Sequence, residues 1–115
     1  TSKMRARIFM MGSISALILL GFLTSCARQQ EQEDLAVQKC IELCLKAKEQ
    51  GINLSNGPCL SDFMDYDVYD YVCDVAHWPR ESIDNKPENQ CIAYRQGLRH
   101  HFVEVDPDCN FIRKH

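Results

Sequence analysis

The sequence predicts a small α+β domain, rich in disulfides, with one long N-terminal helix and a small antiparallel sheet. Three features predict this class. Residues 34–50 have the hydrophobic spacing of an amphipathic helix, residues 70–78 and 100–105 have the composition of strands, and six of the seven cysteines lie between residues 40 and 109. A chain of 115 residues has room for one small core.

The helix over residues 34–50 is the clearest element. Its apolar side chains recur at steps of three and four residues: Leu35, Val37, Ile41, Cys44 and Leu45. Asp34 is the expected N-cap and Gly51 the expected C-terminal stop. Cys40 and Cys44 are four residues apart and share a face, so we expect them to tether the helix to two other segments rather than to bond each other. A reactive dithiol, or half of a metal site, is the alternative.

The remaining elements follow from local composition. Residues 53–62 read as a turn-rich loop, and residues 70–78 as a strand with Tyr71, Cys73 and Val75 on one face. Residues 79–89 read as an exposed loop, residues 88–96 as a short helix that carries Cys91 and Tyr94, and residues 100–105 as a second strand, followed by a turn and a short apolar piece at 111–112.

The cysteine count predicts three disulfides. An even set in a short exported domain is typical of a disulfide framework, and six cysteines can pair in fifteen ways. The sequence does not choose among these pairings. The six are Cys40, Cys44, Cys59, Cys73, Cys91 and Cys109.

The N-terminus predicts export. Lys3, Arg5 and Arg7 precede residues 8–23, which carry no charged side chain, and this arrangement is typical of a secretory signal peptide. Leu23-Thr24-Ser25-Cys26 at the end of the apolar run resembles the lipobox of prokaryotic lipoproteins. The resemblance implies that Cys26 receives a diacylglyceryl group and becomes the new N-terminus. An uncleaved signal anchor and ordinary cleaved secretion are the alternatives, and all three place residues 27–115 outside the cytoplasm.

These boundaries define three segments: a signal peptide at 1–25, the anchor cysteine with a hydrophilic spacer at 26–34, and a cysteine-rich α+β domain at 35–115. Without the three N-terminal cations, 10 basic residues remain against 16 acidic ones, a net charge of −6. This charge argues against nucleic acid as a partner.

Sites for metal or catalysis have weak support in the sequence. His77, His100 and His101 with Glu104 or Asp106 are possible zinc ligands, but no paired ligand motif is present. Acidic residues gather at 62–74 and 84–89 without the glycine and glutamate of an EF-hand loop, so a solvated acidic surface is favoured. We therefore expect no tightly bound cofactor and no catalytic residue, with weak calcium or zinc binding left open.

Several blocks of the domain, "NGPCLSD", "VCDVAH", "PENQC" and "HFVEVDPDCNFIR", resemble uncharacterised small cysteine-rich lipoproteins of archaea. The resemblance covers most of residues 40–113 and implies no activity. Trp78, Arg80, His77 and His101 are the candidate binding surface, for a protein or glycan partner. The function expected is that of a lipoprotein held on the extracytoplasmic face of the cell membrane through Cys26, acting as a binding or structural module of the envelope. The alternative is a small extracytoplasmic metal-dependent or redox enzyme.

Overall fold

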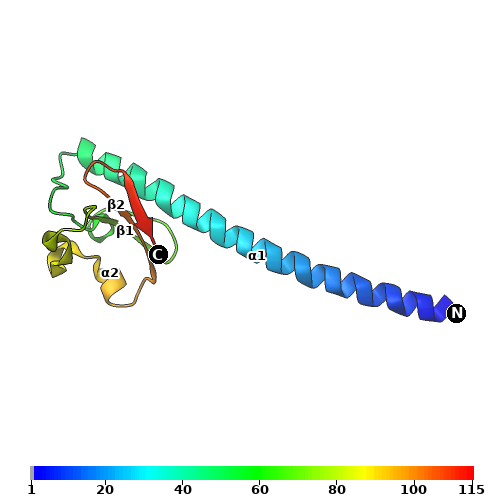
Figure 1. Ribbon diagram of the computed structural model, residues 1–115. Helices are drawn as coiled ribbons and strands as arrows, with labels where there is room; N and C mark the ends of the chain where they lie inside the picture. Colours follow the sequence, from blue (N-terminus) through cyan, green and yellow to red (C-terminus); the bar gives the residue numbers. More distant parts are fainter. Residues whose placement is uncertain (1) are drawn as a thin grey trace. The chain divides into compact units, whose positions relative to one another are not determined.

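The computed structural model describes residues 2–115, with side chains described from residue 24 onward (Figure 1). Its main elements are the helices α1 (Ser2–Glu49) and α2 (Ile92–Arg95) and the strands β1 (Tyr71–Val75), β2 (His101–Val105) and β3 (Phe111–Lys114). Three short 3₁₀ helices, η1 (Leu60–Asp62), η2 (Ser82–Asn85) and η3 (Pro87–Asn89), lie in the connections. The chain divides into two compact units, one up to Gln32 and one spanning Glu33–His115. The second unit contains the three strands, α2 and the three disulfides.

The part of α1 in this second unit packs on the sheet through a narrow stripe. The buried residues of the stripe are Ala36, Cys40, Leu43, Cys44 and Ala47. Leu35 and Leu45, which the spacing placed on the buried face, are exposed at 42% and 51%. Asp34 was expected to cap the helix, but α1 continues through it.

The C-terminal end of α1 lies where the sequence predicted it. Gly51 has φ +76°, a conformation that glycine adopts without the steric cost of a Cβ. The backbone N–H of Ile52 donates to the Ala47 carbonyl at 3.0 Å, and that of Gly51 donates to the Lys48 carbonyl at 3.0 Å. This is the Schellman arrangement of hydrogen bonds, which satisfies the last carbonyls of a helix.

The α+β class is confirmed, and the sheet is mixed. Its order is β1-β2-β3, with β2 and β3 antiparallel. The sequence predicted an antiparallel sheet of residues 70–78 and 100–105, but β1 and β2 run parallel, from Tyr71↔His101 to Val75↔Val105. The third strand, β3, forms where the sequence predicted only a short apolar piece at 111–112. Parallel neighbours need a crossover of about a dozen residues or more, and residues 76–100 supply it.

The two faces of the sheet differ in what they bury. The predicted face of Tyr71, Cys73 and Val75 packs toward α1, together with Val103 and Val105 of β2. Tyr66 belongs to the same core, and its hydroxyl donates to the Ala36 carbonyl at 2.6 Å. Side chains alternate along a strand, so Val72, Asp74, Phe102 and Glu104 lie on the opposite face.

Three disulfides join these layers, as the even cysteine set predicted. Cys40 of α1 bonds Cys73 of β1, and Cys44 bonds Cys109 in the turn between β2 and β3. The helix is therefore tethered to two other segments, as its cysteine spacing indicated. The third disulfide, Cys59–Cys91, lies on the opposite face of the sheet. Cys26 is the free cysteine and is exposed.

Gly57 lies in the turn before Cys59, with φ +69°. A Cβ at this position would stand 2.7 Å from Oδ1 of Asp84 and 2.9 Å from the carbonyl oxygen of Val75. Both the backbone conformation and the close approach of these two groups therefore require glycine.

Almost all of the predicted signal peptide, residues 1–25, lies outside the residues whose side chains the structure describes. Over residues 24–115, no helix is both long and apolar enough to cross a membrane. The predicted spacer, residues 26–34, is helical as part of α1, and its side chains are mostly exposed.

Candidate functional site

The face of the sheet away from α1 is the floor of a cleft of about 460 Å³. Its floor comes from the three strands, and its wall from residues 80 and 90–95. The lining residues are Val72, Asp74, Phe102, Glu104, Arg113, Arg80, Gln90, Cys91, Tyr94 and Arg95. The volume lies within the range of about 300–1,000 Å³ that is common for small-molecule sites.

Two contacts hold the wall of the cleft beside the sheet. The Cys59–Cys91 disulfide fixes the residue that precedes α2. The backbone N–H of Ile92, the first residue of α2, donates to Oδ1 of Asp62 at 3.1 Å. Tyr94 and Arg95 therefore face the cleft from an element that is only one turn long but is fixed at its start.

Glu104 is a buried carboxylate held by two arginines. Nε and Nη2 of Arg113 each lie 3.1 Å from one of its carboxylate oxygens, and Nη1 of Arg80 lies 3.6 Å from Oε1. The bond to Arg113 is bidentate, which is the strongest geometry for this type of pair, and it raises the pKa of Arg113. Glu104 and Arg113 are partners across β2 and β3, so the register of the hairpin sets this contact.

Asp74 lies beside Glu104, because the two residues are register partners in the parallel pair of strands. Among the described residues, Oδ1 of Asp74 is a buried side-chain oxygen with no hydrogen-bond partner. Burial, and secondly the negative charge of Glu104, raise the pKa of Asp74 to about 9, and the charge of Arg80 offsets part of this rise. The Asp74 carboxyl group is therefore neutral at pH 7.

Part of the cleft lining is apolar, and we call this part the apolar wall. The ring of Phe102 meets Tyr94 edge to face at 5.3 Å and stacks on His115 at 5.7 Å. The guanidinium of Arg113 lies 5.2 Å from the centre of the same ring. Val72 and the Cys59–Cys91 disulfide lie beneath these rings. The cleft thus combines an apolar surface with a charged one.

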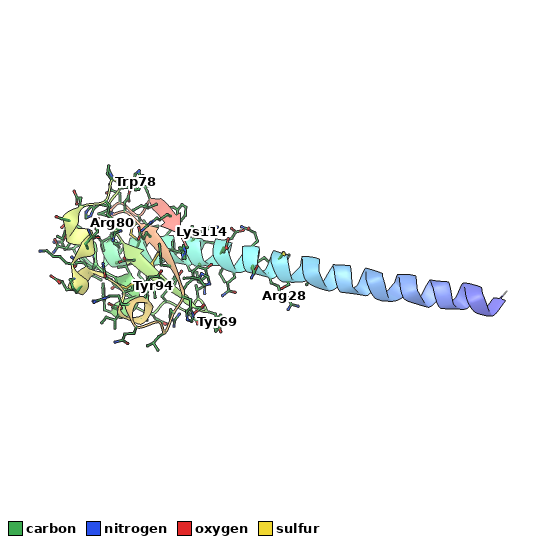
Figure 2. The ribbon with its side chains drawn as sticks, turned by 60° about the horizontal axis from the view of Figure 1, so that its bottom comes forward. Arg28, Tyr69, Trp78, Arg80, Tyr94 and Lys114 are labelled. Atoms are coloured by element: carbon green, nitrogen blue, oxygen red, sulfur yellow. A yellow bond between two sulfur atoms is a disulfide. The ribbon has the colours of Figure 1, made fainter. Side chains whose placement is uncertain are left out.

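The four predicted surface residues do not form one site. Arg80 lines the cleft, while Trp78 is 76% exposed and lines a separate hollow of about 390 Å³ together with Asp106, Phe111, Ile112 and Arg113. Figure 2 shows Trp78 and Arg80 in the same part of the domain. His101 lies at the start of β2, where its ring stacks on Tyr71 at 5.0 Å.

His77 has a structural contact with Asp84 rather than an exposed position. Its Nδ1 lies 2.8 Å from Oδ1 of Asp84, and its backbone N–H donates to the other oxygen of the same carboxylate at 3.1 Å. Burial opposes ionisation of Asp84, but hydrogen bonds from Glu81 and His77 outweigh it and lower the pKa of Asp84. This network fixes the segment that carries Arg80.

The structure does not gather the predicted zinc ligands into one site. His77 contacts Asp84, and Glu104 is held by Arg113. His100 and His101 both contact Asp70, at 2.8 and 3.7 Å. Within residues 24–115, three potential metal-ligand atoms come close together at Cys59, Asp62 and Cys91. The two cysteines of this group form a disulfide, so their sulfurs are not available as thiolate ligands.

The sequence identified Asp74 as a candidate calcium ligand and Glu104 as a candidate zinc ligand. It gave no indication of a role for Arg113, Phe102 or Arg95. The alternation of side chains along the strands could have indicated the four strand residues, because it places them on the face opposite the core. Comparisons of the chain with protein-family models, with curated proteins and with solved structures gave no match, so the resemblance to archaeal lipoproteins stays a prediction.

Proposed function

We propose that this chain is a membrane-anchored extracytoplasmic lipoprotein whose domain is a binding module, with the cleft on the sheet as its ligand site. The observation that carries the proposal is the Asp74 carboxyl group, which is half-buried, lines the cleft and has one buried oxygen without a hydrogen-bond partner. A buried polar atom without a partner costs about 1–3 kcal/mol. A ligand that binds the Asp74 carboxyl group offsets part of this cost.

Binding is a better account of the cleft than catalysis. Catalysis by a pair of carboxyl groups needs one neutral acid and one base that is free to take a proton. Asp74 meets the first requirement. Both oxygens of Glu104, however, accept hydrogen bonds from Arg113, so this carboxylate serves to hold the arginine rather than to take a proton.

Two independent observations support the proposed location. Three disulfides join the domain, and disulfides persist in oxidising, extracytoplasmic compartments. The seventh cysteine, Cys26, is exposed and unpaired, and it ends the lipobox-like Leu23-Thr24-Ser25-Cys26. Two acyl chains on one cysteine give a stable anchor, whereas one chain alone binds only marginally.

The anchor is tested by replacing Cys26 with serine. We expect Cys26→Ser to abolish incorporation of labelled fatty acid and to release the chain from the membrane fraction. Ser25→Ala is the matched control, because it keeps a small residue before the cysteine and leaves the acylated position intact. Unchanged retention and unchanged mass of the Cys26→Ser protein would overturn the lipoprotein assignment.

The ligand site is tested by NMR on the ¹⁵N-labelled full chain in non-ionic detergent micelles, titrated with a collection of anionic, neutral and cationic small solutes. Solutes that bind should shift the amide resonances of Val72, Asp74 and Glu104. Arg95→Glu at the rim of the cleft should change which solutes bind, whereas Lys86→Glu, the same charge change at an exposed position outside the cleft, should not. If no solute shifts these resonances, the cleft is not the ligand site.

A further inference from the structure

We propose that the ligand of the cleft is a small carboxylate with an apolar or aromatic body. Its carboxylate group accepts a hydrogen bond from the Asp74 carboxyl group and pairs with the guanidinium of Arg95, while its body packs on Phe102 and Tyr94. This inference rests on the proposed function of the cleft as a ligand site and names the chemical class of the ligand.

The charge of the cleft favours an anion. Its lining carries three guanidinium groups, those of Arg80, Arg95 and Arg113, against the single carboxylate of Glu104 when Asp74 is neutral. A positive excess inside a partly enclosed cleft attracts anions and repels cations more strongly than the same charges do in water.

Arg95 is the guanidinium that is free to bind a ligand. Arg113 holds both oxygens of Glu104, and Arg80 donates to the side chain of Asn85 at 2.9 Å and contacts Glu104. Arg95 is exposed at the rim, and no hydrogen bond or ion pair of its side chain is found among the described residues. A carboxylate would meet its planar donors in the bidentate geometry that guanidinium favours.

Asp74 supplies the second contact because it is a hydrogen-bond donor when it is neutral. A carboxyl O–H that donates to a carboxylate forms a short, charge-assisted hydrogen bond of about 2.5–2.7 Å. An uncharged ligand could accept the same hydrogen bond but would gain nothing from Arg95. The donor at Asp74 and the cation at Arg95 together select a carboxylate.

The apolar wall defines the rest of the ligand. Phe102 and Tyr94 present ring surfaces, with Val72 and Cys91 beside them, and contact with such surfaces removes apolar ligand area from water. The cleft, at about 460 Å³, is near the lower end of the common range of about 300–1,000 Å³. A ligand of one or two rings fits this volume.

The affinity of the cleft for a carboxylate should depend on pH, because Asp74 donates a hydrogen bond only when it is protonated. The charged or titratable groups around Asp74 come from every neighbouring element: Glu104 of β2, Arg113 of β3, Arg80 after β1, Asp84 of η2, Asp62 of η1, and Tyr94 and Arg95 of α2. If the anion binds the protonated form, affinity should be constant from pH 6 to 8 and about tenfold weaker at pH 10 than at pH 7. Asp74→Asn keeps a neutral donor, so it should bind at pH 7 and lose the change between pH 8 and 10.

The experiment compares benzoate, benzamide and benzylammonium on the full chain in non-ionic micelles, with the amide resonances of Val72 and Glu104 as the readout. We expect benzoate to bind at least tenfold more tightly than either of the other two. Arg95→Gln should weaken benzoate binding about tenfold, and Lys86→Gln, an exposed lysine outside the cleft, should leave it unchanged.

Two kinds of failure are distinguishable. If benzamide or benzylammonium shifts the cleft resonances as strongly as benzoate does, the carboxylate class is overturned while the cleft remains the ligand site. The same conclusion follows if the benzoate affinity of the native chain does not fall between pH 8 and 10, or if Arg95→Gln leaves this affinity unchanged. If none of the three probes, and no member of the wider solute collection, shifts these resonances, the proposed function fails together with this inference.

Discussion

Replacing Asp74 with asparagine should stabilise the domain at neutral pH and should remove one component of its pH dependence. The pKa of the Asp74 carboxyl group is 3.8 in an unperturbed chain and about 9 in the folded domain. The folded state therefore holds a proton that the unfolded state releases, so this group makes stability fall as pH rises from about 4 to about 9. Asparagine keeps a neutral side chain of the same shape and does not titrate.

The magnitude follows from the pKa difference. Each pH unit inside the window changes the free energy of unfolding by about 1.4 kcal/mol. About three such units separate the ordinary pKa from pH 7, so Asp74→Asn should raise the free energy of unfolding by up to about 4 kcal/mol at that pH. Near pH 4 the two proteins should differ little.

The assay is urea unfolding of the full chain in non-ionic micelles with the disulfides intact, followed by near-ultraviolet circular dichroism at pH 5, 6, 7, 8 and 9. The difference between Asp74→Asn and the native chain isolates the Asp74 contribution from that of other groups. Asp65→Asn, a change at an exposed aspartate, is the control and should show no growing difference. A difference that stays flat between pH 5 and 8 would refute the neutral, buried state of Asp74.

Three further predictions test the scaffold. Gly57→Ala should lower the free energy of unfolding by more than about 2 kcal/mol. Gly51→Ala, at a position with the same sign of φ but open space where a Cβ would stand, should lower it by about 1 kcal/mol. Equal losses would contradict the contact described for Gly57. Tyr66→Phe should cost about 1 kcal/mol through the lost hydroxyl hydrogen bond, measured by the same urea titration. Replacing both Cys59 and Cys91 with alanine should cost about 4 kcal/mol, since the bridge closes a loop of 32 residues, and should broaden the cleft resonances in NMR spectra.

The number of disulfides, and the tethering of the helix to two other segments, could be predicted from the sequence because they depend on local rules. Cys40 and Cys44 are one helical turn apart, which disfavours a bond between them and favours a separate partner for each. Which cysteines pair could not be predicted, because the partners lie on distant segments. The stop at Gly51 and the shared face of Cys73 and Val75 follow from the helical and strand periods in the same way. None of these inferences required knowledge of which distant segments meet.

The contacts that depend on distant segments could not be predicted. The parallel pairing of β1 and β2 is set by the path of residues 76–100 and not by either strand. Leu45 matched the spacing of a buried face, but α1 approaches the sheet through Ala36, Ala47 and two disulfides. Small side chains on this stripe let the backbones come close, and Leu35 and Leu45 then fall outside the contact.

The candidate site could not be predicted either, because it too depends on contacts between distant segments. Asp74 lies in a stretch of aspartates, and composition does not separate it from the exposed Asp65 or Asp67. Its burial follows from the strand alternation, and its proximity to Glu104 follows from the parallel register. Arg113 joins the pair through the register of β2 and β3. One residue of slip in either pairing would separate these groups.

One face of the sheet packs on α1 and stabilises the domain, and the opposite face forms the cleft. Keeping the half-buried Asp74 neutral costs up to about 4 kcal/mol at pH 7, which is a large part of the net stability of so small a core. Cys73, the residue before Asp74, is bonded to α1 on the opposite face, and a disulfide that closes a loop of this length contributes about 4 kcal/mol. Alternation along β1 thus places a stabilising bond next to a destabilising carboxyl group. This arrangement allows a short chain to keep an unpartnered polar group at a ligand site, and it predicts that Asp74→Asn will partly offset the loss of the Cys40–Cys73 disulfide.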